Sequence, residues 1–278
     1  MYTSRMPAIL LYGAAFLLYA ALAFHFWRTR WRGSGAPRIA RWERTVVLVP
    51  LALHTWLVYD MLLAPQELRF GFGHALSMML WLAVIIYWVE SRFLELEGMQ
   101  APVLALAAVC VPLPALFPGL ASPSSAHSTE LRLHLVLAMV AYGMFTIAAL
   151  HALLMTLMEK RLHGGALAGP LAALPPLLTM ERLLFRVILA GFAFLTLTLV
   201  TGIAFSETLF GRAMKFDHKT VFAISSWFIF AALLAGRYFY GWRGRTALRW
   251  TLAGFLALLL AYVGSRFVLE VVLRRGVV

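Results

Sequence analysis

Histidine is the residue type that most clearly marks candidate chemistry in this chain of 278 residues. Eight histidines are present, and five either lie inside long apolar stretches or begin them at the predicted outer face: His54, His74, His134, His151 and His218. An ionisable side chain inside a membrane segment is costly and therefore points to function. The other three lie at helix ends or in a loop, where an interfacial or solvated histidine is ordinary: His25, His127 and His163.

Two of the five are predicted at similar depth. His54 lies near the middle of one apolar stretch and His151 in the inner half of another, each roughly 10–15 Å from the predicted cytoplasmic helix end. If their helices touch, the imidazoles can face each other as an inner pair of haem ligands. The alternative is that the two histidines are separate and each is hydrogen-bonded to a neighbouring helix. His134 lies about 25 Å from His151 along the same helix, so these two cannot ligate one iron.

The remaining candidates are predicted at the outer face, where His74, His134 and His218 open three different apolar stretches. Three imidazoles at one level can bind zinc. Two can ligate haem iron while nearby cations bind the propionates. Histidine is also common at interfaces, where it reaches water. The candidate cations are Lys219, Arg212, Arg69 and Arg266.

Acidic side chains accompany the cations at the outer face. Arg266 and Glu270 are spaced i,i+4 and can pair on one helix face. Asp60 lies near the outer end of the second apolar stretch. A structural charge pair shielded from lipid explains Arg266 and Glu270 as well as a ligand site does.

The elements that must position these residues are membrane helices. Hydrophobic residues make up 62% of the chain and charged residues 13%, whereas soluble domains carry about 25% charged. We expect a single all-α membrane domain over residues 1–278, a bundle of about eight transmembrane helices. Pro112 and Pro114 interrupt the fourth span. The predicted spans are 6–27, 46–65, 73–91, 101–117, 132–157, 183–205, 219–236 and 249–271.

The distribution of Lys and Arg predicts the orientation of the bundle. Fourteen basic residues fall in the loops at 28–45, 92–100, 158–182 and 237–249, and eight fall on the opposite side. The richer side should be cytoplasmic, which places both termini outside. The net charge of +12 is therefore an orientation signal, and no nucleic-acid partner is expected. The single cysteine, Cys110, excludes an intramolecular disulfide and cysteine-based metal clusters.

Several segments resemble a known family. Residues 217–220 read DHKT, and residues 241–244 read GWRG, in a short basic loop after the seventh span. The segment HLVLAMVAY at 134–142 and the segment FGFGHALSMMLW within 68–90 add to the pattern. Together they resemble the cytochrome c assembly family, in the branch of CcsA-related, YpjD-like and HemX-like inner membrane proteins. The resemblance covers about residues 45–273.

This resemblance implies a bacterial, multi-pass protein of the cytoplasmic (inner) membrane that binds or handles haem. In the resemblance, His134 matches an external haem-ligand histidine and His54 a transmembrane one. From the residues themselves we expect His134 and His218 as outer iron ligands and His54 and His151 as inner ones. We expect His74, Lys219 and Arg266 as further haem-binding residues. The family's tryptophan-rich WWD loop is missing, since none of the nine tryptophans lies in a predicted outer loop. A second external histidine is also missing near the C-terminal end, over Phe267 to Leu273.

We therefore expect non-covalent haem handling rather than enzymatic catalysis. The chain shows no activated nucleophile and no carboxylate pair in a loop. The expected partners are the lipid bilayer, haem, and other proteins of cytochrome c maturation or the tetrapyrrole pathway. The alternative is a membrane transporter, or a regulatory or structural partner subunit, that keeps the fold without binding haem.

Overall fold

All regular secondary structure in the described parts of the computed structural model of the protein is helical, which confirms the all-α prediction. These parts are residues 5–31, 41–63, 70–93, 96, 98–119, 129–163, 176–205 and 217–273. Three predicted residues, His127, Arg69 and Arg212, lie outside them. The helices are α1 (Arg5–Phe26), η1 (Trp27–Trp31), α2 (Arg41–Val46), α3 (Leu48–Leu63), α4 (Phe72–Glu90), α5 (Gln100–Cys110), α6 (Leu113–Leu116), α7 (Thr129–His163), α8 (Leu177–Ala204), α10 (His218–Tyr240), α11 (Gly244–Leu259), η4 (Leu260–Gly264), α12 (Ser265–Phe267) and η5 (Val268–Val272).

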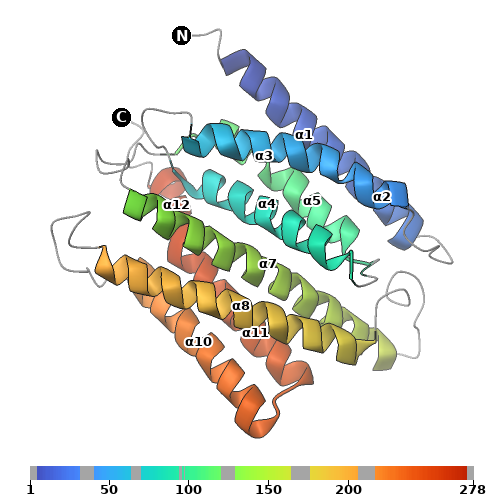
Figure 1. Ribbon diagram of the computed structural model, residues 1–278, viewed down its shortest axis with the longest axis vertical. Coiled ribbons are helices and arrows are strands. Elements are labelled where there is room, and N and C mark those ends of the chain that lie inside the picture. Colours follow the sequence, from blue (N-terminus) through green and yellow to red (C-terminus); the bar gives the residue numbers. More distant parts are fainter. Residues whose placement is uncertain are drawn as a thin grey trace.

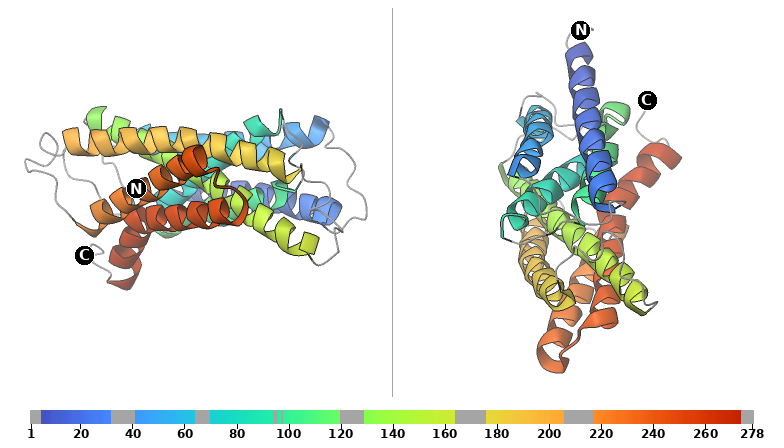
Figure 2. Two further views of the ribbon diagram at one scale, coloured as in Figure 1. Left: turned by 90° about the horizontal axis from the view of Figure 1, so that it is seen from below. Right: turned by 90° about the vertical axis from the view of Figure 1, so that its right-hand side faces the viewer.

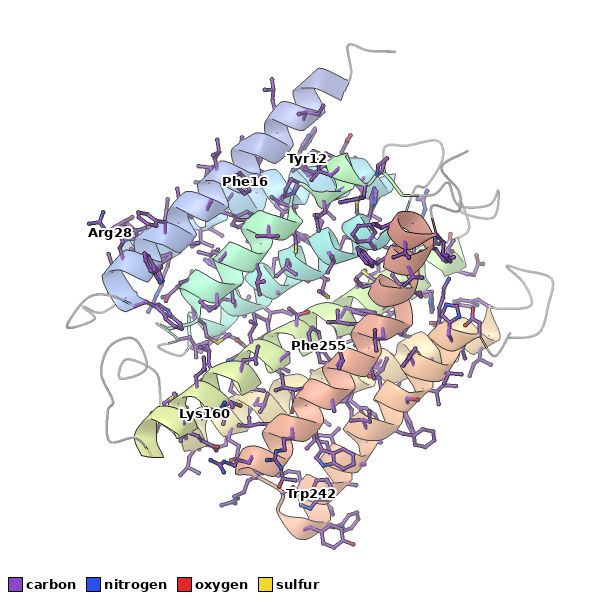
Figure 3. The ribbon with its side chains drawn as sticks, turned by 180° about the vertical axis from the view of Figure 1, so that it is seen from behind. Tyr12, Phe16, Arg28, Lys160, Trp242 and Phe255 are labelled. Atoms are coloured by element: carbon purple, nitrogen blue, oxygen red, sulfur yellow. The ribbon has the colours of Figure 1, made fainter. Side chains whose placement is uncertain are left out.

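Seven of the described helical runs are long and apolar enough to cross a membrane. The fourth predicted span is instead a broken helix, because Val111 and Pro112 separate α5 from α6. The long helices lie side by side as an elongated bundle (Figures 1 and 2). Their outer faces carry apolar and aromatic side chains, including the labelled Phe16 (Figure 3). Such an all-round apolar surface is what a lipid environment favours.

The helices α4 and α7 form the centre of the bundle. In each of them 61% of the apolar window is buried, against 22–33% in the other five spans. Helix α7 packs against α4, α8 and α11, while α1 packs against α3 and α5. The stacked rings of Phe145 and Phe230, 3.8 Å apart, join α7 to α10. Ionisable side chains in the apolar windows of α4 and α7 are therefore more buried, as a rule, than those on the outer helices.

Helices α7 and α8 extend further than their predicted spans, into the region 158–182 that was expected to be a loop. The reason is that carboxylates in these extensions have cationic partners on other helices. Glu159 pairs with Arg245 at 3.5 Å, and Glu181 pairs with Arg237 at 2.6 Å. Charged residues in the predicted loop therefore belong to the ends of helices, where they form ion pairs.

The two ends of the bundle differ in composition. Helices α4, α7 and α10 begin at one end, where α8 and η5 finish (Figure 1). His74, His134 and His218 therefore lie at the same end, which we call the histidine end. The opposite end carries Arg30, Arg237 and the α10–α11 turn, and we call it the arginine end.

Candidate functional site

His134 is held at the histidine end with a defined orientation. Its Nδ1 lies 3.0 Å from the hydroxyl of Thr201 on α8, and that hydroxyl lies 2.8 Å from the Leu197 carbonyl. Because the hydroxyl donates its only hydrogen to a backbone carbonyl, it accepts a hydrogen from Nδ1. His134 is then protonated on Nδ1, and the lone pair on Nε2 remains for a ligand. Gly202 permits this contact, since a Cβ there would lie 3.2 Å from the imidazole Cε1.

His218 is the exposed first residue of α10. Helix α10 begins there because the Asp217 carboxylate accepts hydrogen bonds from the backbone N–H of Thr220 at 3.0 Å and from its hydroxyl at 3.2 Å. Burial opposes ionisation of Asp217, but these hydrogen bonds and the nearby Lys219 and His218 lower its pKa overall. The structure shows no hydrogen bond or ring contact between His134 and His218, both of which it describes.

A second group of polar side chains lies at the histidine end. We call it the polar cluster, and it consists of His74, Tyr262, Arg266 and Glu270. Phe70 connects the two sides of it, with ring centroids 6.0 Å from His74 and 5.8 Å from Tyr262. The guanidinium of Arg266 lies 5.7 Å from the Tyr262 ring centroid and 4.0 Å from Glu270.

Several atoms of the polar cluster are buried and have no hydrogen-bond partner. They are Nδ1 of His74, Nε of Arg266 and both carboxylate oxygens of Glu270. Buried polar groups are usually paired, so such a concentration points to a bound ligand or water. Lys219 lies close enough for its charge to act on Arg266. Two of the predicted cations therefore act on each other electrostatically, beside the carboxylate of Glu270.

His54 is fully buried and has partners on both ring nitrogens. Nδ1 lies 3.4 Å from the Tyr19 hydroxyl on α1, and Nε2 lies 3.0 Å from the Ser77 hydroxyl on α4. The residue therefore ties α3 to both neighbours. This is the arrangement in which each inner histidine bonds to an adjacent helix.

His151 is also fully buried, and its partners differ from those of His54. Its Nδ1 donates to the Ile147 carbonyl at 2.9 Å, which leaves the Nε2 lone pair free. Nε2 lies 3.8 Å from Glu90 of α4 and has no hydrogen bond, and neither carboxylate oxygen of Glu90 has one. The structure does not show His54 and His151 in contact with each other. Their pairing around an iron stays a prediction.

Zinc finds no support in the described residues. Among them, no group of three or more histidine, cysteine, aspartate or glutamate side chains comes together in a way that can hold a metal ion. His74, His134 and His218 share an end of the bundle but do not converge on one point. Of the two metal alternatives for the histidine end, haem needs fewer protein ligands.

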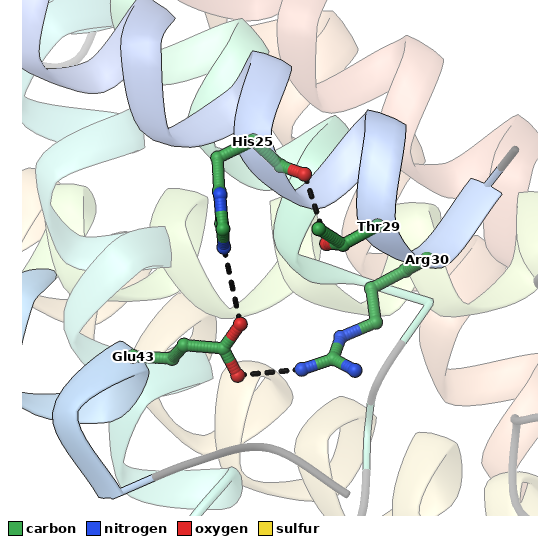
Figure 4. A network of polar contacts seen from close by, with 4 residues as sticks. All are labelled: His25, Thr29, Arg30 and Glu43. Carbon is green, nitrogen blue, oxygen red and sulfur yellow. Dashed lines mark hydrogen bonds and ion pairs between the residues drawn. The ribbon is translucent and has the colours of Figure 1, made fainter. Parts of the chain in front are cut away.

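Sequence reasoning missed a buried network at the arginine end (Figure 4). Glu43 accepts from Arg30 at 2.5 Å and lies 3.1 Å from Nε2 of His25, which joins α2 to the end of α1. Arg30 is only 2% exposed. From its neighbours alone Arg30 resembles a loop cation, and only a glutamate 13 residues later in the chain indicates a buried ion pair.

The GWRG loop also has a clear structural role at the arginine end. Gly241 closes α10 with a positive φ of 65°, and the Trp242 N–H donates to the Gly236 carbonyl at 3.1 Å. Arg237 donates to Glu181 of α8 at 2.6 Å and to the Trp242 carbonyl at 3.1 Å. These residues clamp α8, α10 and α11 together, far from the histidine end.

The fold and the two ends define a polytopic membrane protein with three histidines at one end and most of its described basic residues at the other. Residues 42–273 match the family described as cytochrome c assembly protein. The match covers most of the chain, so the chain belongs to this family. With its seven long apolar helices, it is an inner membrane protein.

Individual relatives agree with this assignment. The chain is 38% identical over 139 residues to the inner membrane protein YpjD of Escherichia coli K12, which is 50% of this chain and 52% of that protein. It is 36% identical over 88 residues to the cytochrome c biogenesis protein CcsA of Prochlorococcus marinus MIT 9515, 32% of this chain and 28% of that protein. The chain thus matches about half the length of the YpjD protein and less of the CcsA protein.

Proposed function

We propose that this protein binds and handles haem without covalent catalysis, with His134 as an iron ligand. The observation that carries the proposal is the state of His134: Thr201 holds the hydrogen on Nδ1, and Nε2 is left as a lone pair. Metal-ligating histidines usually have their second nitrogen fixed by such an outer partner. Bound haem would supply the iron chemistry, and the protein would bind and orient it.

The other predicted residues complete this proposal. His218 is exposed at the same end and would serve as the second outer ligand. Lys219, Arg266 and His74 would bind the propionates, since they contribute charge and unpaired buried nitrogens there. At the inner site, His151 has an unprotonated Nε2, whereas His54 would first have to release Tyr19 or Ser77.

The proposal includes a single membrane domain over residues 1–278 with both termini outside. The fourteen basic residues on the side of the arginine end support this orientation. Haem would then be held at the external face. Other proteins of cytochrome c maturation or of the tetrapyrrole pathway are the partners to which such a protein would deliver or from which it would receive haem.

The absorbance spectrum of the detergent-purified protein tests the proposal. Histidine-ligated haem should give a Soret band that weakens in His134→Ala and in His218→Ala. The matched control is His25→Ala, because His25 lies at the opposite end and bonds to Glu43. A colourless protein that also takes up no added haem would refute the proposal, and so would an equal loss of the band in the control.

A further inference from the structure

Glu270 is a carboxylate whose charge has no hydrogen-bonded counter-ion. It lies in η5, one turn after Arg266, and Oε1 is 4.0 Å from the guanidinium Nη1. Its side chain is 7% exposed, and neither oxygen has a partner of good hydrogen-bond geometry, although the backbone N–H of Phe72 lies near the carboxylate. Nε of Arg266 is buried and unpaired as well. The two groups are therefore close enough to attract each other but do not form the hydrogen-bonded pair that arginine and carboxylates favour.

The chain packs the carboxylate closely against its backbone. Gly71, just before α4, has no side chain there, and a Cβ at that position would lie 2.8 Å from Oε1 of Glu270. The carboxylate is thus inside the polar cluster rather than directed into lipid. Lys219 and Arg266 supply two positive charges to this region, and Glu270 supplies one negative charge.

We propose that Glu270 is an internal counter-ion that holds Arg266 in the ligand-free protein and yields it to a carboxylate of the bound ligand. This inference rests on the proposed haem function and identifies which residue sets the affinity for a propionate. A guanidinium binds an incoming carboxylate through two parallel hydrogen bonds, which the 4.0 Å pair does not provide. Glu270 remains nearby and repels the incoming group, so it weakens binding of carboxylate-bearing ligands.

Two iron-free porphyrins test this role without any iron ligation. Protoporphyrin IX carries two propionates, and octaethylporphyrin carries none. In Glu270→Gln, the dissociation constant for protoporphyrin IX should fall about tenfold, since a like charge has been removed. Arg266→Gln should raise it by a similar factor. Neither variant should change the affinity for octaethylporphyrin, measured by fluorescence in the same detergent.

The matched control is Arg132→Gln, an exposed arginine in the first turn of α7 at the same end of the bundle. It should leave both affinities within about twofold of the wild type. Glu270→Asp withdraws the carboxylate from Arg266 by one methylene and should give a smaller gain in the same direction. It therefore tests the proposal even if Glu270→Gln does not fold.

The outcomes separate this inference from the proposed function. Unchanged or weaker protoporphyrin binding in the Glu270 variants would overturn the counter-ion role while leaving haem binding intact. An equal gain for octaethylporphyrin would also overturn it, because the effect would then come from packing rather than charge. If neither the wild type nor any variant takes up iron protoporphyrin, the haem function fails, and the counter-ion role fails with it.

Discussion

Glu181 should contribute substantially to stability through the clamp at the arginine end. Its carboxylate accepts from Arg237 at 2.6 Å and lies 3.4 Å from the backbone N–H of Gly244, so one side chain on α8 binds both α10 and α11. The Arg237 guanidinium also lies over the Phe185 ring at 4.6 Å. The substitution Glu181→Gln keeps the size of the side chain and removes its charge.

The size of the effect follows from the exposure of the two partners. The Glu181 side chain is 9% exposed and that of Arg237 is 27% exposed. Breaking a fully buried pair costs about 3–5 kcal/mol, and an exposed pair contributes less than about 1 kcal/mol. The partial exposure of Arg237 places this pair between the limits. We expect Glu181→Gln to lower the free energy of unfolding by about 2 kcal/mol.

Unfolding of the detergent-solubilised protein by a denaturing detergent measures this change. The control is Arg245→Gln, because Arg245 is 65% exposed and its contact with Glu159 spans 3.5 Å at the same end of the bundle. It should cost less than about 1 kcal/mol. If Glu181→Gln costs no more than the control, the clamp does not stabilise the protein and the reasoning from burial is wrong.

Three further predictions concern the histidine end and the interior. Asp217→Ala should destabilise the protein by about 1 kcal/mol through loss of the α10 cap. Because the folded pKa of Asp217 is lowered, its stabilisation is full above the unfolded pKa of about 4 and is lost as pH falls through the folded value. Asp217→Asn should remove this acid dependence in unfolding curves while keeping most of the cap. Thr201→Val should weaken haem binding about 10- to 100-fold by releasing His134 from its orientation, whereas an unchanged titration would argue against the assigned tautomer. Glu90→Leu combined with His151→Leu should be closer to the wild type in stability than either single variant, because each single change leaves one buried polar partner alone. Additive losses in this double-mutant cycle would show that the two do not interact.

Composition and periodicity predicted which segments are helical, but they did not predict which side chains pair between helices. Long apolar runs predicted the all-helical fold because a bilayer leaves few other options. The break at Pro112 was anticipated, but the lengths of α7 and α8 were not. Those extensions depend on Glu159 and Glu181 finding arginines on α11 and α10, which are about 60–90 residues away in the chain. Nothing in a local window indicates such a partner.

For the histidines, too, the sequence predicts the position along the helix but not the partner of the side chain. Their placement along the helices predicted that His74, His134 and His218 share one end, and the structure agrees. Depth alone made His54 and His151 look like a pair, yet the rotation of each helix decides what the imidazole faces. His54 faces Ser77 and Tyr19, and His151 faces Glu90. Glu90 was missed because it stands next to Ser91 and Arg92, in what reads as an ordinary helix end.

The GWRG loop carries part of the family resemblance, yet its role in the structure is in folding. The GWRG loop closes α10 and joins the Arg237 clamp, so its sequence is explained by folding. The outer residues proposed to bind haem lie at the opposite end of the bundle, on α4, α7, α10 and α12. The central helices α4 and α7 contribute His74, Glu90, His134 and His151, and they are also the most buried spans. A buried ionisable side chain is costly in a membrane unless it binds something. If the proposed haem function holds, α4 and α7 carry four of its ionisable side chains, so variants of these residues discriminate haem handling from a purely structural role better than variants in the motif.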